Sequence, residues 1–515
     1  MPSLLASVSI FVAIFVLPVM GLKRVLDRRR RKALLHYHPG PPPSGLITGH
    51  LSDMPAKKPW ITYTAWTKQY GDVIHLEALG DHIILINSFE AANDLLEKRS
   101  RIYSNRPHVH AGEISGWMFN LTFLPHTDEW RRARRTYQQN FRPDAVRAMA
   151  PMITDAIGQL TKQLLAKPQN FADHILVLSA GISLKAMFGI TVKSSDDPLL
   201  PLAVEAIHTL DGVWVPNFII ITAVCPFIRY VPKWVPLLGS TRAFIDRTRE
   251  CLRELQRAPL ERAMADIKAG RENNSIMGDA LRKLISEGGS VDSPEFARTR
   301  DMASTTYVAS ADTFLSSVKT FFLAMARNPI CQEKAQKEID EIVGRGRLPS
   351  FEDRKSLPYV EAVYREVMRW HPAIPIGPAH ATSEDDMYNG HYIPKGALIL
   401  PNIWAMTRDE RRYKNPDDFI PERFLDVDGK LNKDDVVLAF GFGRRICVGR
   451  HFGDAVVWMT IASVLACFKI AKDKDENGRE IDVPEKYSDG PGQFSYPLPF
   501  KCAITPRYPG VEALV

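Results

Sequence analysis

The sequence contains few cysteines, and none of them stands in a pattern that would organise a fold. Its six cysteines are spread over 515 residues without a Cys-x-x-Cys pair. A disulfide framework needs densely spaced cysteines and a structural zinc site needs paired ligands, so neither is predicted. The interior also lacks a Gly/Ser-rich linker and an internal repeat. One large domain therefore remains open, although length alone suggests about three.

Positive charge is scarce outside one short segment. The chain carries a net charge of +7, but residues 23–32 hold seven Lys and Arg against Asp27, and these alone supply +6. A nucleic-acid-binding protein would spread its basic side chains over a folded face. The sequence therefore argues against a nucleic-acid partner. It favours a membrane, because the basic segment directly follows a hydrophobic one.

That hydrophobic segment predicts a membrane anchor. Leu4–Leu22 has 19 residues without a charge, which as a helix is about 28 Å long and matches the ~30 Å hydrocarbon core. A cleaved signal peptide is the alternative, but it would carry its positive charge before the apolar run. By the positive-inside rule the body is cytosolic. We expect a transmembrane anchor at 1–22, a basic flank and proline-rich hinge at 23–45, and the body at 46–515.

Strand signals are few in the body of the chain. Val73–Glu77 and His82–Ile86 flank Gly80-Asp81 and predict a β-hairpin, and Asn477-Gly478 is a second hairpin signal. Helical patterns dominate elsewhere, so the predicted fold is mainly α with small β-sheets. The apolar stretch Phe218–Ile228 is too short to span a bilayer. It either dips into the membrane interface or is an ordinary buried segment.

One long helix is predicted in the second half of the chain. Ser293 can cap its N-terminus with Pro294 at the first helical position, and 34 residues without Gly or Pro follow before Pro329. Such a helix is about 50 Å long and crosses a whole domain. Its middle places Asp312 and Thr313 in an apolar stretch, where an unpartnered charge is costly. The pair is either a satisfied core contact or a functional acid and hydroxyl.

The residues around Cys447 are hard to explain as packing. Gly441, Gly443 and Gly449 permit tight turns and close approach by a flat ligand, and Arg444 and Arg445 add positive charge. A predicted helix follows, so Cys447 lies near a helix N-terminus, which favours a thiolate. A zinc site shared with His451 is an alternative, but it needs two further ligands that the spacing does not offer. A lone buried cysteine is the other alternative.

This loop resembles the haem loop of the cytochrome P450 family. The family pattern Phe-x-x-Gly-x-Arg-x-Cys-x-Gly is matched by Phe440, Gly443, Arg445, Cys447 and Gly449. The resemblance extends from about Pro39 to the C-terminus. It implies the cytochrome P450 fold, with a single large haem domain behind the anchor, and haem b whose iron is bound by the thiolate of Cys447.

Other family motifs occur in the expected order. Glu366 and Arg369 match a Glu-x-x-Arg motif that Arg423 completes into a structural triad, although on the residues alone the pair could be a surface salt bridge. Trp130 and Arg134 resemble the family's Trp-x-x-x-Arg helix, which implies that both contact a haem propionate. His380 stands where the family often places another propionate partner.

The long helix resembles the family's oxygen-side helix with two departures. Asp312 and Thr313 are kept and are implied to deliver protons to oxygen. Ser310 replaces the usual glycine, and Phe314 replaces the second hydroxyl residue. These departures change two positions of the family pattern, but the acid–hydroxyl pair remains.

The resemblance also implies a function and partners. It points to a monooxygenase in the endoplasmic reticulum membrane that uses O2 and electrons from NADPH–cytochrome P450 reductase, with cytochrome b5 as a possible second partner. The chain is most similar to fungal microsomal members of secondary metabolism, the group that includes O-methylsterigmatocystin oxidoreductase. Its substrate would be a lipophilic small molecule on a terpenoid, sterol, polyketide or aromatic scaffold. The pocket residues implied are Trp117, Met118, Phe119, Trp214, Tyr307, Ile374, Ile376 and Phe494.

Two other functions stay open from the sequence. A haem-thiolate isomerase or dehydratase needs no external electrons and commonly lacks the acid–threonine pair, so Asp312 and Thr313 argue against it. A non-catalytic haem-binding sensor would be accompanied by a signalling or DNA-binding module, and none is recognisable in the sequence.

Overall fold

The computed structural model describes residues 35–236, 238–489 and 494–514. The anchor predicted at 1–22 and the basic part of the hinge lie outside these residues. The described chain forms two compact units, each assembled from separate stretches of sequence. Unit 1 contains the described residues up to Pro107, Ile376–Met406 and Phe442–Arg444, and unit 2 contains the remainder. A single haem domain over 46–515 stays a prediction.

Unit 1 is built around a four-stranded sheet. Strands β1 (Val73–Ala78) and β2 (Asp81–Ile86) pair antiparallel, β2 pairs parallel with β6 (Leu398–Pro401), and β6 pairs antiparallel with β3 (His380–Ala381). The hairpin predicted at Gly80-Asp81 is confirmed. The other elements of this unit are α3 (Pro59–Tyr70), α4 (Phe89–Ala92), α5 (Ser100–Tyr103), β4 (Asp386–Tyr388), β5 (His391–Ile393) and α18 (Ile403–Thr407, whose last residue belongs to unit 2).

The described end of the proline-rich hinge is seated on this sheet. The N–H of His75 donates to the carbonyl of Pro39 at 3.0 Å. A Cβ at Gly40 would meet the carbonyl oxygen of His75 at 2.1 Å, so the two backbones approach closely. The ring of Tyr37 stacks on His75 and His82, with centroid distances of 4.6 and 5.1 Å. The described end of the proline-rich hinge is therefore attached to unit 1 by specific contacts.

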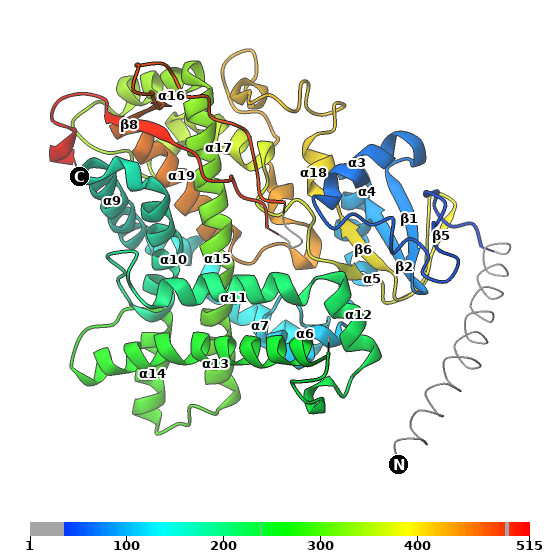
Figure 1. Ribbon diagram of the computed structural model, residues 1–515. Coiled ribbons are helices and arrows are strands. Elements are labelled where there is room, and N and C mark those ends of the chain that lie inside the picture. The colour runs from blue at the N-terminus through cyan, green and yellow to red at the C-terminus, as the bar shows by residue number, and fades with distance from the viewer. Residues whose placement is uncertain (1–34, 237, 490–493, 515) are drawn as a thin grey trace. The chain divides into compact units, whose positions relative to one another are not determined.

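Unit 2 is helical and is organised by the long helix α15 (Pro294–Arg327), as Figure 1 shows. The predicted start is confirmed, because the hydroxyl of Ser293 accepts a hydrogen bond from the N–H of Phe296 and Pro294 opens the helix. The other helices are α6 (His110–Ser115), α7 (Asp128–Phe141), α8 (Pro143–Ala148), α9 (Ala150–Ala166), α10 (Phe171–Phe188), α11 (Leu199–Val213), α12 (Pro216–Val224), α13 (Leu238–Lys268), α14 (Ile276–Glu287), α16 (Pro329–Ile342), α17 (Pro358–Trp370) and α19 (Arg450–Cys467).

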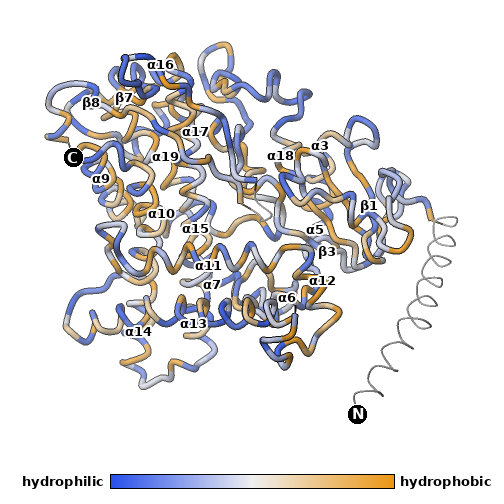
Figure 2. The backbone as a smooth tube through the Cα atoms, in the orientation of Figure 1, coloured by the Kyte–Doolittle hydropathy of each residue, from blue (hydrophilic) through white to orange (hydrophobic). Residues whose placement is uncertain are grey.

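The core of unit 2 forms where α10, α15 and α19 pack together. Helix α10 lies along α15. Helices α11 and α13 lie side by side and run across the direction of α15 (Figure 1). Every residue of α19 from Ala455 to Cys467 is buried, and these helices are rich in hydrophobic residues in Figure 2. The helix that follows Cys447 is thus held firmly in the core.

The second hairpin signal gives less than a hairpin. Asn477-Gly478 forms a turn that is closed by a single bridge between Lys474 and Glu480. The two strands near it, β7 (Phe468–Lys472) and β8 (Cys502–Pro506), pair with each other across a long connection. Charged, exposed side chains lie on both sides of the turn. The two sides therefore have no apolar face to bury, and the single bridge is not extended into paired strands.

One helix among the described residues is long and apolar enough to cross a membrane. It covers Pro168–Phe188, and 72% of its most hydrophobic window is buried inside the protein. This burial is what a core helix shows, because α10 packs against α15. The bent pair α11 and α12 passes the same test only if the two are taken together.

Candidate functional site

Cys447 lies in the loop that leads into α19. Its backbone N–H donates to the carbonyl of Phe440 at 2.9 Å, which closes the loop on itself. Gly443, in the part of the loop that belongs to unit 1, has a φ of +55°, and a Cβ there would meet the carbonyl oxygen of Leu96 at 2.0 Å. This position therefore requires glycine. A Cβ at Gly449 would lie 4.0 Å from the sulfur of Cys447, so the backbone passes close to the thiol.

The pKa of the Cys447 thiol differs from the expectation from the sequence, in which the helix N-terminus favours a thiolate. Burial is the largest influence and raises the pKa of Cys447 above its ordinary value. The N–H of Gly449 and the charges of Arg134 and Arg450 lower it, but they do not outweigh burial. The predicted helix N-terminus therefore does not by itself make a thiolate. Coordination to a metal would supply the missing stabilisation, because a metal-bound thiol loses its proton.

Cys447 retains accessible surface, although the surrounding protein is dense enough for burial to dominate its pKa. Within the described residues, no group of three or more His, Cys, Asp and Glu side chains is arranged to hold a metal ion. A zinc site at Cys447 therefore lacks ligands in this part of the chain. A single thiolate ligand suits haem instead, because the porphyrin supplies the other donors.

Trp130 and Arg134, one turn apart on α7, lie next to this loop. Arg134 donates to the carbonyl of Ile446 at 2.9 Å, and burial lowers its pKa to about 10. The indole N–H of Trp130 is buried and has no acceptor among the described residues. An orphaned donor beside a partly buried guanidinium fits a carboxylate, as a haem propionate would supply. The residues of the loop therefore fit the implied cofactor.

Arg445 serves the loop in a way that the sequence did not indicate. It donates to the carbonyl of Leu124 at 2.8 Å and lies 4.3 Å from the ring centroid of Trp130. Arg444 is exposed. The cations that act on the thiol are Arg134 and Arg450, and Arg450 was missed by the sequence reasoning. The signal was present, because Arg450 opens the helix directly after the motif.

The middle of α15 presents one accessible face. Ala309 is exposed and Thr313, one turn later, is half-buried, whereas most of their neighbours on this helix are buried. The hydroxyl of Thr313 donates to the carbonyl of Ala309 at 2.8 Å. This leaves its oxygen lone pairs available to accept a hydrogen bond. The Ala309–Thr313 face of α15 is thus accessible, unlike most of this helix.

Helix α15 contacts the helix that follows the cysteine loop. Phe314 packs against Phe452 at a ring-centroid distance of 6.0 Å, and a Cβ at Gly453 would lie 3.3 Å from Phe314 and 3.6 Å from Phe440. The residue that follows Thr313 therefore contacts the first turn of α19, which carries Cys447 just before it. Phe314, where the family has a hydroxyl, fills space between the two helices.

Asp312 and Ser310 point elsewhere. The hydroxyl of Ser310 donates to the carbonyl of Tyr307 at 3.3 Å, so it satisfies its own helix. Asp312 is buried, and its Oδ2 has no hydrogen-bond partner among the described residues. Burial raises the pKa of Asp312 to about 7; Asp211 adds to the shift and Lys319 opposes it. A carboxyl in this position holds a proton near neutral pH.

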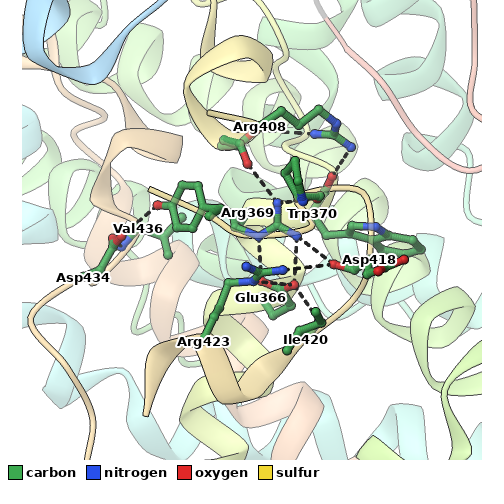
Figure 3. Close-up of polar contacts among 12 residues, drawn as sticks. Glu366, Arg369, Trp370, Arg408, Asp418, Ile420, Arg423, Asp434 and Val436 are labelled. Carbon is green, nitrogen blue, oxygen red and sulfur yellow. Dashed lines mark hydrogen bonds and ion pairs between the residues drawn. The ribbon is translucent and has the colours of Figure 1, made fainter. Parts of the chain in front are cut away.

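The structure brings the three residues of the predicted triad together (Figure 3). Glu366 and Arg369 on α17 are both 0% exposed and form two bonds of 2.6 and 2.8 Å. Arg423 reaches Oε1 of Glu366 at 3.2 Å, and the N–H of Ile420 donates to the same oxygen at 2.7 Å. Arg369 also donates to the carbonyls of Thr407, Pro416 and Asp418. The surface-salt-bridge alternative is therefore wrong for this pair.

The remaining predicted residues are divided between the units. His380 and Ile376 belong to unit 1, and Nδ1 of His380 lies 2.8 Å from the carbonyl of Tyr103, so their roles stay predictions. Tyr307 is buried, and its hydroxyl donates to the carbonyl of Leu199, which ties α15 to α11. The other predicted pocket residues in unit 2 are Trp117, Met118, Phe119, Trp214, Ile374 and Phe494, and all are buried or half-buried at its hydrophobic core.

Comparisons with known proteins agree with this geometry. A family model described as Cytochrome P450 matches residues 39–495. The chain is 37% identical to cytochrome P450 monooxygenase ple1 of Rhodocybe pseudopiperita, over 96% of this chain and 94% of the relative. It is 36% identical to cytochrome P450 monooxygenase 98 of Postia placenta, over 95% and 94%, and 35% identical to cytochrome P450 monooxygenase claR of Ampulloclitocybe clavipes, over 92% and 88%.

Proposed function

Because this chain belongs to the cytochrome P450 family, we propose that it oxidises a lipophilic small molecule with O2 and with electrons that a partner reductase draws from NADPH. When bound, haem supplies the oxidising chemistry, while the protein supplies ligand, protons and shape. The observation that carries the proposal is the accessible Ala309–Thr313 face of α15, the helix that packs against α19 directly after the Cys447 loop. The proposal is tested by turnover of the purified protein with the reductase. Product that forms without NADPH would indicate an isomerase or dehydratase instead.

Thr313 is the residue on this accessible face that can hold a proton. Its hydroxyl donates a hydrogen bond to the carbonyl of Ala309. The hydroxyl oxygen can still accept a hydrogen bond from a proton donor on the accessible side of the helix. The adjacent acid, Asp312, lies about 100° around the helix, so its proton reaches this face through a side-chain rotation or a water. The substrate would lie over the same face, against the apolar residues of unit 2.

Replacing Thr313 by alanine should separate electron use from product formation. We expect Thr313→Ala to keep haem and NADPH consumption but to lower the product formed per NADPH by about tenfold or more, with hydrogen peroxide released instead. Peroxide and product are measured in the same reaction. Ser317→Ala is the matched control, because its hydroxyl bonds to the carbonyl of Thr313 one turn later and is buried. Unchanged coupling in Thr313→Ala would remove the proposed role.

The raised pKa of Asp312 makes coupling depend on pH. With a pKa of about 7, the carboxyl loses its proton as the pH rises, so product per NADPH should fall roughly tenfold between pH 6 and pH 8. The folded chain keeps the Asp312 proton up to about pH 7, whereas the unfolded chain loses it above about pH 4. The contribution of this group to the unfolding free energy therefore falls between about pH 4 and pH 7 and is constant at higher pH. Asp312→Asn should show a flat pH profile, and a sloping one would contradict the assignment.

We place the protein at the endoplasmic reticulum membrane as a single-pass protein with a cytosolic body. The support is the anchor predicted at 1–22 together with exposed hydrophobic side chains at the end of α12 and after it: Val224, Phe227, Tyr230 and Trp234 are 60–81% exposed. Tyr and Trp among such residues are typical of a membrane interface. The exposed arginines of α7, Arg131, Arg132 and Arg135, offer an acidic reductase a docking charge.

The substrate class follows from the apolar lining. The predicted pocket residues are mainly aromatic and aliphatic, which suits a terpenoid, sterol, polyketide or aromatic scaffold of secondary metabolism. The relatives are fungal cytochrome P450 monooxygenases, which supports an oxidation but names no substrate.

A further inference from the structure

A cluster of four aromatic side chains in unit 2 joins two distant segments of the chain. Trp117 and Phe119 come from the turn after α6, Phe123 follows them, and Trp214 ends α11. The ring centroids of Trp117 and Phe119 are 5.8 Å apart, those of Trp117 and Phe123 are 6.4 Å apart, and those of Phe123 and Trp214 are 5.1 Å apart. We call these four residues the aromatic cluster. Phe123 was not predicted from the sequence.

The aromatic cluster contains two hydrogen-bond donors that are not used within the protein. The indole nitrogens of Trp117 and Trp214 are both buried and have no acceptor in the described ranges of the chain. An indole N–H only donates, and a buried donor without an acceptor carries a desolvation cost. Two such donors, linked through one phenylalanine, are satisfied together if a bound molecule brings acceptor atoms to them.

The aromatic cluster is attached to the Cys447 loop. The segment that carries Trp117 and Phe123 ends at Leu124, and the carbonyl of Leu124 accepts a hydrogen bond from Arg445 at 2.8 Å. Arg445 precedes Cys447 by two residues. Trp117 is buried, whereas Phe119, Phe123 and Trp214 are half-buried, so three of the four rings retain accessible surface. The segment that carries three of the four rings is therefore hydrogen-bonded to the loop that carries Cys447.

The chemistry of the donors limits what they select. An indole N–H is neutral, so it suits a carbonyl, hydroxyl or ether oxygen. A carboxylate would lose its hydration at this place, and the neutral indole would offer no counter-charge. Aromatic rings around the donors suit a rigid apolar skeleton. We propose that Trp117 and Trp214 select, for the oxidation proposed above, rigid apolar substrates that already carry at least one neutral acceptor oxygen, over hydrocarbons of the same skeleton. This rests on the proposed function.

The test compares two ligands that differ only in oxygen. The haem-loaded protein is titrated with 5α-androstane-3,17-dione and with 5α-androstane, and the dissociation constants are taken from spin-state shifts. We expect the dione to bind at least about fivefold more tightly per indole N–H engaged, since one hydrogen bond of about 1 kcal/mol corresponds to that factor. Trp117→Phe and Trp214→Phe should each reduce this preference about fivefold. The constant for the alkane should change less than twofold, because the ring is kept.

Trp458→Phe is the matched control. Its indole N–H is also buried without an acceptor among the described residues, but it lies on α19 in the core, beside Phe351 and Arg354. We expect this variant to keep the wild-type preference. Three outcomes would overturn the inference. The wild-type protein shows no preference for the dione, it binds neither ligand, or Trp458→Phe lowers the preference as much as the two cluster variants do. The reduced CO spectrum is recorded in parallel: a thiolate-type band leaves the proposed function intact in each of these cases, and its absence removes the proposed function itself.

Discussion

Replacing Cys447 by serine should abolish the strongly red-shifted Soret band of the reduced, CO-bound protein. The band depends on a thiolate opposite CO, and the described residues around the loop offer no second cysteine: Cys331, Cys467 and Cys502 lie on other elements. Serine keeps the size of the side chain and the loop bond to the carbonyl of Phe440, which involves the backbone only. The folded protein should therefore remain, while thiolate ligation is lost.

The control for this experiment is Cys331→Ser. Cys331 is half-buried on α16 and belongs to no site described above. We expect its band and haem content to equal those of the wild type. A band that survives in Cys447→Ser, with Cys331→Ser unchanged, would show that another group holds the iron. In that case the match of the loop to the family motif would be misleading.

Replacing Glu366 by alanine should have the largest effect on stability. Glu366 is 0% exposed and holds two arginines, so its removal leaves the charge of Arg369 buried without a counter-charge. Removing one partner of a buried pair costs about 3–5 kcal/mol. We expect the unfolding free energy to fall by this amount and haem to be lost. Glu366→Gln should be intermediate, because its amide oxygen can still accept from the N–H of Ile420.

The chain offers a matched pair with the same spacing on its surface. Glu254 and Arg257 on α13 are also a Glu-x-x-Arg pair, with bonds of 2.7–3.1 Å, but both side chains are exposed. Glu254→Ala should leave the unfolding midpoint almost unchanged, since solvent takes over the charge of the arginine. Denaturant unfolding of both variants compares one motif in two environments. Equal effects would contradict the assignment of the buried network as structural.

Local sequence signals predicted the elements well. Ser293-Pro294 and the absence of Gly and Pro before Asn328 defined α15, and Gly80-Asp81 defined the β1–β2 hairpin. These signals act through the backbone of a few neighbouring residues, so they can be recognised without the rest of the chain. The Asn477-Gly478 signal gave only a bridged turn, because a hairpin also needs a face to bury.

Chemical identity was likewise visible in the sequence. The spacing of Phe440, Gly443, Arg445, Cys447 and Gly449 indicated the family, to which the chain belongs. Gly443 shows the reason, since the turn needs a positive φ and has no room for a Cβ. What such a motif specifies is the shape of one loop, which is a local property.

Properties that depend on distant residues were decided only by the tertiary structure. The spacing of Glu366 and Arg369 equals that of Glu254 and Arg257, and only the packing of α17 against residues 407–423 makes the first pair a buried network. In the same way, the loop motif did not reveal that burial raises the pKa of Cys447 or that Arg450 opposes it. Desolvation and charge act through space between segments that the sequence separates. The sequence by itself therefore determined which family and which loop this protein has, and the fold decided how its charges and donors are satisfied.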